Sequence, residues 1–551
     1  MKKKNNLLLA LLLSTTLIFA QFKSLERIIP SNAEMVVSIN GNQITELLSI
    51  TNFDQSEIGQ LLLKEMKRSS DHVKSIADLG FKIDAKAYYF FEVKENTSFH
   101  NFLIKIDNRE NFEKLFSSRD RKKIEIINNT RILDLRGDIS VWTDNSLLLS
   151  FSKSLHSTDD ENSKTSRKDY ALNLLKTSAI NSVLTIPSYT KSKNKKASAS
   201  FWVKNYSDFM SLMLKDVFKS MGKLRGYQNM DFYGINALSG HLFFDKDKVA
   251  LKTTMHIDKE WQNDFKKIYD KKFNKKFYKY FNQNAAIAYF NLTMSTKGIL
   301  ESYPNIMANM YETILPKYKE ETRVAADLLN IILDEEAIEE LIGGDFLFVL
   351  NDLKQQETNY TSYDYDADYK KTEVIKTKQE LLPDFTLMMS SKNEKFLTRI
   401  MRLGIKHDLL GNKGSYYSII EAKKLPIDLF IGIKNNIVFL TSSENRLQQI
   451  MLGTFKSNLG KHKKLLSKNA MTFYVNGTEI IKKTPKDMIN FDKKFEKLMK
   501  IVVNKKLEVA LSTSKFKASK IETKLIINTP ENEENSLRFF FDLFNEFVSN
   551  K

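Results

Sequence analysis

The seven histidines are the residues of this sequence best suited to bind a metal ion or to transfer a proton, and they stand apart from one another. They occupy positions 72, 100, 156, 241, 256, 407 and 462. No two have the spacing of a His-Glu-x-x-His zinc motif, and the sequence has no nucleophile elbow, phosphate loop or dinucleotide fingerprint. It also has no cysteine, which excludes thiolate metal sites and disulfides. We therefore predict no catalytic, metal-binding or cofactor-binding residues.

An alternation of tyrosine and aspartate is the most unusual polar stretch in the chain. Its candidate contact residues are Tyr363, Asp364, Tyr365, Asp366, Asp368 and Tyr369. Aspartates at alternate positions begin an EF-hand calcium loop, but Tyr369 stands where that loop needs glycine and Ile375 where it needs glutamate. The stretch therefore predicts a solvated loop or an acidic and aromatic contact surface. A looser calcium site is the third interpretation.

Lysines alternate with aromatic residues over 271–280. The candidate contact lysines are Lys271, Lys272, Lys275, Lys276 and Lys279, and the aromatic residues between them are Phe273, Phe277, Tyr278 and Tyr280. Such a segment can dock on anionic lipid headgroups or on an acidic glycan. The simpler interpretation, which we favour, is a helix with a buried aromatic face and a lysine-rich face in water.

The elements that would position these residues occur twice. Residues 199–269 match 471–541 at a single offset of 272 (471 − 199), so that Phe201 aligns with Phe473 and Phe265 with Leu537. A shorter pattern, Asn-Ala followed by a strand and another Asn, begins at Asn32, 284 and 469. These repeats predict an internal duplication.

Short hairpins decide the fold class. The segments 139–149 and 429–439 each predict two strands joined at Asp144-Asn145 and Asn435-Asn436, because Asn and Asp tolerate the positive φ of a tight turn. Strands joined so closely must pair antiparallel. We expect an α+β fold of two related lobes, 21–281 and 282–551, each an antiparallel meander sheet with helices packed on it. Residues 352–380 are predicted to be an inserted polar loop.

The first twenty residues have the pattern of a signal peptide. Lys2 to Lys4 precede the apolar run 7–13, and a cut after Ala20 fits signal peptidase. The apolar part is shorter than the roughly 20 residues that span a bilayer, and no later segment is apolar enough, so no transmembrane segment is expected after cleavage. We expect export to the periplasm or to the periphery of the outer membrane.

The formal net charge of +18 favours anionic partners. Export makes nucleic acid an unsuitable partner, which leaves anionic lipid or an acidic glycan. A compositional bias toward lysine explains the same charge without any partner, and we favour that interpretation.

The chain resembles an exported family of Bacteroidota known only as a domain of unknown function. The resemblance rests on Ile29-Pro30-Ser31-Asn32-Ala33 with the strand after it, on the repeated antiparallel blocks, and on the Tyr-Asp stretch before Leu382-Pro383-Asp384-Phe385. Many members of that family look like lipoproteins, whereas this chain has no cysteine to carry a lipid. The resemblance implies an envelope location and a two-lobed α+β fold, and it brings no catalytic residues.

Three functions fit these observations. The leading hypothesis is a non-catalytic envelope protein that binds or scaffolds an envelope component. The alternative is a carrier of a lipid or another hydrophobic ligand, suggested by the 38 phenylalanines. The least favoured is a hydrolase of envelope polymers, which needs paired carboxylates or a histidine-centred group in one cleft.

Overall fold

The computed structural model describes residues 24–69, 72–94, 97–135, 138–154, 163–210, 234–314, 316–332, 334–365, 369–420, 426–484, 503, 507–530 and 534–548. The predicted signal segment, Asp366 and Asp368 lie outside these ranges. The chain forms two compact units. The first comprises Met1–Phe209, Ala237–Asp245 and Leu537–Lys551, and the second comprises Met210–Asn236 and Lys246–Ser536. The predicted division into 21–281 and 282–551 stays a prediction.

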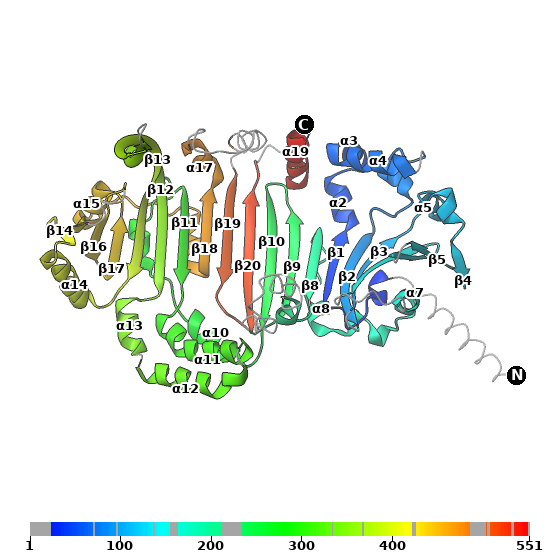
Figure 1. Ribbon diagram of the computed structural model, residues 1–551, viewed down its shortest axis with the longest axis horizontal. Helices are drawn as coiled ribbons and strands as arrows, with labels where there is room; N and C mark the ends of the chain where they lie inside the picture. The colour runs from blue at the N-terminus through cyan, green and yellow to red at the C-terminus, as the bar shows by residue number, and fades with distance from the viewer. Residues whose placement is uncertain are drawn as a thin grey trace. The chain divides into compact units, whose positions relative to one another are not determined.

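Every strand pairing in the first unit is antiparallel, as the short connections predict. In spatial order its strands are β9 (Ile235–Phe244), β8 (Ala199–Val203), β1 (Met35–Asn40), β2 (Lys86–Lys94), β3 (Thr97–Lys105), β7 (Ser146–Ser154), β6 (Asp138–Trp142), β5 (Thr130–Leu135) and β4 (Glu125–Ile127). The strands are labelled in Figure 1.

The core of the first unit lies between one face of its sheet and short helices. Phe90, Leu103 and Trp202 of the sheet pack with Tyr170 of α7 and Tyr189 of α8. The helices are η2 (Leu25–Ile28), α2 (Gly41–Leu47), α3 (Ile50–Gln55), α4 (Glu57–Ser69), η3 (Ile76–Leu79), α5 (Arg109–Glu113), α6 (Ser118–Arg121), α7 (Ser163–Leu175), η4 (Ala179–Asn181), η5 (Val183–Thr185), α8 (Pro187–Ser192) and α19 (Ser536–Val548).

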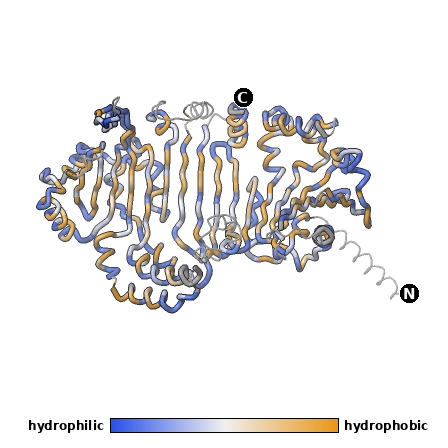
Figure 2. The backbone as a smooth tube through the Cα atoms, viewed as in Figure 1, coloured by the Kyte–Doolittle hydropathy of each residue, from blue (hydrophilic) through white to orange (hydrophobic). Residues whose placement is uncertain are grey.

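The second unit is built on a longer antiparallel sheet. In spatial order its strands are β10 (Lys248–Ile257), β20 (Lys520–Asn528), β19 (Glu508–Ser514), β18 (Asn469–Asn476), β11 (Ala288–Thr293), β12 (Asp345–Tyr365), β13 (Lys371–Ser390), β17 (Ile437–Thr441), β16 (Phe430–Lys434), β15 (Tyr417–Ile419) and β14 (Leu410–Asn412). Figure 2 shows hydrophobic residues concentrated along these strands.

The core of the second unit joins alternate strand residues to aromatic side chains from outside the sheet. Leu347, Met388 and Phe439 are almost fully buried, and they pack in one cluster with Phe277 and Phe281. The helices are α10 (Gln262–Tyr269), η7 (Lys275–Tyr280), α11 (Thr296–Ile314), η8 (Pro316–Tyr318), α12 (Lys319–Ile332), α13 (Glu335–Leu341), α14 (Glu394–Lys406), α15 (Glu444–Leu452), α16 (His462–Lys468) and α17 (Gly477–Lys483).

These observations confirm the α+β class and the antiparallel meander with helices packed on it. The two units also share a strand order. In the first unit it runs β8–β1–β2–β3–β7–β6–β5–β4, and in the second β18–β11–β12–β13–β17–β16–β15–β14. Descent of the two from one duplicated segment stays a prediction. No helix within the described ranges is long and apolar enough to cross a membrane.

Candidate interaction site

The hairpin of β12 and β13 runs far beyond its neighbours. Its pairing with the rest of the sheet ends at Leu350 on the β11 side and at Thr386 on the β17 side. The two strands continue to pair with each other from Asp352↔Asp384 to Tyr365↔Lys371. We call this two-stranded extension, 352–365 and 371–384, the arm; in Figure 1 its strands pass the ends of their neighbours and curl over.

The arm corrects the prediction of an inserted polar loop over 352–380. The segment forms regular strands because its aromatic and β-branched residues favour extended backbone, and each strand supplies the other's hydrogen-bond partners. Tyr369 has a φ of 57° next to the end of the arm, a conformation that turns the chain. The polar composition suggested a loop, because the sequence does not show that 356–365 pair with 371–380 of the same segment.

One face of the arm carries large exposed side chains, together with the charged residues Glu357, Lys371 and Glu373. Directly paired residues share a face, so Thr361 and Ile375 lie on the same side as Tyr363 and Tyr365. Tyr363 is 45% exposed, Tyr365 63% and Ile375 73%. Lys371 lies 3.5 Å from the centroid of the Tyr363 ring, a cation–π contact that orients the ring.

The opposite face of the arm is covered with paired charges. Lys376 forms an ion pair with Asp364 at 2.9 Å, and Lys378 pairs with Glu380. The Lys378 ammonium also lies 5.5 Å from the centroid of the Tyr360 ring. These exposed pairs contribute little stability, but they satisfy the charges of this face locally. The face that contains Tyr363 is therefore the one suited to a partner.

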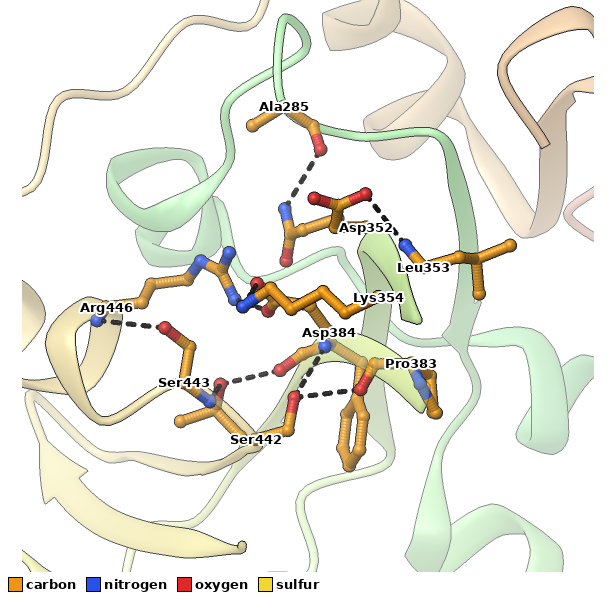
Figure 3. Close-up of polar contacts among 12 residues, drawn as sticks. Ala285, Asp352, Leu353, Lys354, Pro383, Asp384, Ser442, Ser443 and Arg446 are labelled. Carbon is orange, nitrogen blue, oxygen red and sulfur yellow. Dashed lines mark hydrogen bonds and ion pairs between the residues drawn. The ribbon is translucent and has the colours of Figure 1, made fainter. Parts of the chain in front are cut away.

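A buried carboxylate lies where the arm leaves the sheet. Asp384 forms an ion pair with Arg446, and its second oxygen lies 3.1 Å from the Lys354 ammonium (Figure 3). Asp352, next to it in the pairing register, binds Lys483 of α17 at 2.6 Å. We call these five residues the root of the arm.

The cations of the root control the charge on Asp384. Burial acts to raise the pKa of this carboxyl, but the hydrogen bonds and charges of Arg446 and Lys354 outweigh it and lower the pKa below its ordinary value. The group is therefore ionised at neutral pH. Because a buried charge without a partner is costly, the root holds both strands of the arm against α15.

Backbone irregularities at the root set the direction of the arm. The register shifts between Leu350 and Asp352, which marks a β-bulge, and Pro383 follows on the other strand. A bulge bends its strand and ends regular pairing, and proline cannot donate a ladder hydrogen bond. Ser442 compensates, because its hydroxyl donates to the Pro383 carbonyl and accepts from the Phe385 N–H (Figure 3).

Helix α15 places Arg446 for this contact. Ser443 is its N-cap and accepts a hydrogen bond from the Arg446 N–H (Figure 3). Leu447 and Ile450 are completely buried on the face that joins the core, and Gly453 ends the helix with a φ of 79°. Arg446 stands in the first turn beside this anchored face, so its guanidinium is held next to Asp384.

The five lysines predicted to form one contact surface do not all lie at the surface. The aromatic residues Phe273, Phe277 and Tyr280 are buried, and the helix is a short 3₁₀ turn. Lys271 is an internal group, because its ammonium lies 3.3 Å from Glu339 and 3.8 Å from Asp345.

The remaining lysines of this segment lie at the surface. Lys272, Lys275, Lys276 and Lys279 are exposed. Lys276 donates to the carbonyl of Asn435 at 3.1 Å. Any contact with an anionic surface would therefore use these four lysines and not Lys271.

The buried acid beside Lys271 has a perturbed pKa. Asp345 is 3% exposed, and burial raises its pKa to about 6, although Lys271 and Ser390 oppose the shift. Its Oδ2 accepts from the Ser390 hydroxyl at 3.3 Å. The group ties the start of β12 to the end of β13, and no metal-binding group of three or more His, Asp or Glu residues occurs within the described ranges.

Sequence reasoning missed the residues of the root. Asp384 and Arg446 are separated by 62 positions and belong to no motif, so only folding brings them together. One feature of the sequence could have indicated a buried ion pair here. Pro383-Asp384 stands inside an apolar run, and a charge in a buried strand needs a partner. Of the predicted contact residues, Tyr363, Asp364, Tyr365 and Tyr369 are exposed on or beside the arm, whereas Asp366 and Asp368 lie outside the described residues.

The chain belongs to a family of proteins defined by a domain of unknown function (DUF4836), whose pattern matches residues 25–462. The sequence-based resemblance to a family of unknown function is thereby confirmed at that level. No curated protein matches the chain.

Two solved structures show a weak likeness to this chain. The protein TP0453, in its crystal form III, is 11% identical with a TM-score of 0.25, over 43% of this chain and 82% of that one. The DNA polymerase III β subunit of Thermotoga maritima is 8% identical with a TM-score of 0.08, over 74% and 98%. Likenesses at these TM-scores carry no argument about this chain.

Proposed function

We propose that this chain is an exported, non-catalytic envelope protein that binds a partner protein through the arm. The observation that carries the proposal is the arm itself, which extends past the sheet and presents Tyr363, Tyr365 and Ile375 to solvent. An isolated two-stranded ribbon is marginally stable in water. Here the buried root fixes the ribbon in a defined direction, and this fixed direction supports a binding role for the arm.

The composition of the exposed face supports protein recognition. Tyrosine supplies a large and rigid contact area at low entropic cost, and threonine and asparagine beside it supply adaptable hydrogen bonds. Thr361, Asn359 and Thr377 line the same face as Tyr363. The residues 2–20 support export, because their basic and apolar parts follow the signal-peptide pattern.

The absence of cysteine makes a crosslinking test direct. Ile375→Cys places a single thiol on the arm, and Leu452→Cys places one at the end of α15 with matched exposure, 73% against 76%. A cleavable thiol–amine crosslinker is applied to intact cells producing either variant. We expect one defined protein adduct from Ile375→Cys, identified by mass spectrometry, and none from Leu452→Cys.

Two further readouts complete this test. Adding Tyr363→Ala to the Ile375→Cys chain should reduce the adduct several-fold, because aromatic anchors carry much of an interface's energy. Identical adducts from both thiol positions, or none from the arm, would refute binding through the arm. Export is tested separately by cell fractionation and by the N-terminal sequence of the mature chain, expected to begin at Gln21.

A hydrophobic carrier is the second candidate, and one observation favours it. Phe290, Phe346, Phe348 and Phe385 lie on the face of the sheet opposite the buried Leu347, and all four are partly exposed. Their rings pair across strands, with centroids 5.7 Å apart for Phe290–Phe346 and 5.5 Å for Phe348–Phe385. An antiparallel sheet with one solvated face normally alternates apolar with polar residues, so this aromatic face suits an apolar ligand.

Native mass spectrometry distinguishes the two candidates. The mature protein is purified without detergent from the cells that make it. A stoichiometric small-molecule adduct, lost in a Phe348→Ser variant, would support the carrier. A bare chain would contradict a tightly held ligand and would leave the arm proposal to the crosslinking result.

A further inference from the structure

A second exposed surface lies on α12, away from the arm. Val324 is 58% exposed, Leu328 53%, Ile331 79% and Ile332 75%. Their spacing of i, i+4, i+7 and i+8 places them in one stripe along the helix. Ala326, on another side of α12, is only 8% exposed, so these four large apolar residues face water while a small one faces the fold.

This arrangement is the reverse of what an amphipathic helix in a globular protein normally shows. Such a helix turns its apolar stripe toward the core, and a contiguous exposed patch of large apolar residues marks an interaction site. Tyr318 of η8 (Pro316–Tyr318), the residue before the helix, is also 50% exposed. In Figure 1 α12 lies beyond α11, at the margin of the helical group of the second unit.

The surroundings of the stripe are acidic, although the chain as a whole is strongly basic. Residues 317–340 contain three basic and eight acidic side chains, a net charge of −5 in a chain of +18. Glu320, Glu321 and Asp327 are exposed on α12 itself. The stripe thus combines an apolar centre with a negative rim.

Neighbouring contacts hold part of this rim in place. Asp334 caps α13 by accepting a hydrogen bond from the Ala337 N–H at 2.9 Å. Glu336 binds Lys297 of α11 at 2.5 Å, and Glu339 binds Lys271 at 3.3 Å. These ion pairs connect α13 to Lys297 of α11 and to Lys271, and α13 follows α12 directly in the chain.

We propose that the α12 stripe docks a basic amphipathic helix of a partner protein. A helix seats its own apolar residues, spaced at i, i+3 or i+4 and i+7, along such a stripe. Lysine or arginine on the flanks of that helix meets the acidic rim, and complementary charge favours this partner over neutral or acidic ones.

The same rim disfavours two other occupants. An anionic bilayer would place negative headgroups beside Glu320, Glu321 and Asp327. A second copy joined through its own α12 would bring two acidic rims together. The proposal stands independently of the arm, because it concerns different residues.

Synthetic peptides test this proposal on the full mature protein. The probe is a fluorescent peptide of leucine and lysine with leucines at i, i+4, i+7 and i+8. Its counterpart has glutamate at every lysine position. We expect the leucine–lysine peptide to bind at least ten-fold more tightly in fluorescence anisotropy, with an affinity that falls as salt is raised.

Matched variants locate the binding to α12. The double variant Leu328→Ser/Ile331→Ser keeps the charge and should weaken binding about ten-fold or more, as expected for central apolar anchors. Leu452→Ser, which alters an exposed leucine on α15, should leave binding unchanged. Glu321→Gln/Asp327→Asn should weaken binding several-fold and reduce its salt dependence. Thermal unfolding checks that all variants fold, as their exposed positions predict.

The contrary outcomes are equally defined. Equal binding of the two peptides, or full affinity in Leu328→Ser/Ile331→Ser, would overturn the proposal. Self-association of the wild type in analytical ultracentrifugation that the same double variant abolishes would assign the stripe to a second copy. Flotation with anionic vesicles that the double variant abolishes would assign it to a membrane surface.

Discussion

The hairpins β2–β3 and β12–β13 hold the same place in the strand order of their units and end very differently. In the first unit the pairing of β2 with β3 stops at Lys94↔Thr97, close to where the neighbouring strand also ends. In the second unit the equivalent hairpin continues to Tyr365↔Lys371. Both hairpins supply core residues from the part that pairs with the rest of the sheet. Phe90 is the example in β2 and Leu347 the example in β12.

The difference shows that the arm is not needed to complete a sheet of this kind. The first unit builds its core without one, and the core of the second unit uses only the part of β12 and β13 before the root. Residues beyond the root are free of packing constraints and can take the composition of a binding surface. This is the physical basis for our proposal that the arm binds a partner.

A buried acid near each hairpin is held by a different kind of partner. In the first unit Glu92 accepts from the neutral donors Asn32 at 2.6 Å and Tyr170 at 2.8 Å. In the second unit Asp384 is held by the cations Arg446 and Lys354. Charged partners make the root of the arm the more costly contact to break.

The largest effect is expected from breaking the root. Asp384→Ala removes the partner of a largely buried Arg446 and should lower the free energy of unfolding by about 3 kcal/mol or more in urea denaturation. Asp364→Ala breaks an exposed pair on the arm and should cost less than about 1 kcal/mol. Equal losses from both variants would contradict a special role for the root.

A Tyr–His pair in each unit predicts an effect of pH. His462 is 3% exposed, its Nδ1 lies 3.0 Å from the Tyr289 hydroxyl, and burial lowers its pKa to about 4. The unfolded chain protonates this imidazole near pH 6.5, whereas the folded chain does so only near pH 4. Through His462 the free energy of unfolding should therefore fall by about 3 kcal/mol as the pH decreases across that window, whereas the raised pKa of Asp345, about 6, acts in the opposite direction over nearly the same range.

The comparison with the first unit sharpens this prediction. His100 makes the same contact with Tyr89, at 2.8 Å, and burial lowers its pKa as well, but its side chain is less buried. Relative to the wild type, His462→Gln should be spared about 3 kcal/mol of destabilisation between pH 6.5 and 4, and His100→Gln a smaller amount. Unfolding in urea at several pH values measures both. An unchanged slope in His462→Gln would assign the effect to other groups.

The smallest change in stability is expected from removing the arm. Replacing 355–381 by Asn-Gly joins Lys354 to Leu382, which already face each other, through the two-residue turn that hairpins favour. The free energy of unfolding should change by less than about 1 kcal/mol, because the deleted residues are mostly exposed. A large loss of stability would show that the arm belongs to the fold.

The local patterns of the sequence predicted the elements well. Asn435 and Asn436 form the turn of β16 and β17 with φ of 57° and 64°, as their side chains allow. The hairpin predicted at Asp144-Asn145 also forms, with the Thr143 N–H bonded to the Ser146 carbonyl, but neither turn residue has a positive φ. The sequence pattern predicts where the chain turns, whereas the pairing of the strands on either side determines which type of turn forms.

Sequence alone determined the class of this protein, because alternating apolar residues, turn residues and caps act within a few positions of one another. It also singled out Tyr363, Tyr365 and Tyr369 as unusual. Only the tertiary structure decided that these residues lie on or beside a two-stranded arm, that Asp384 meets Arg446 at its root, and that the stripe of α12 faces water. The arm and its root depend on contacts between residues that are distant in the chain. The exposure of the α12 stripe depends on the absence of a covering segment among the described residues. Local sequence patterns contain neither kind of information.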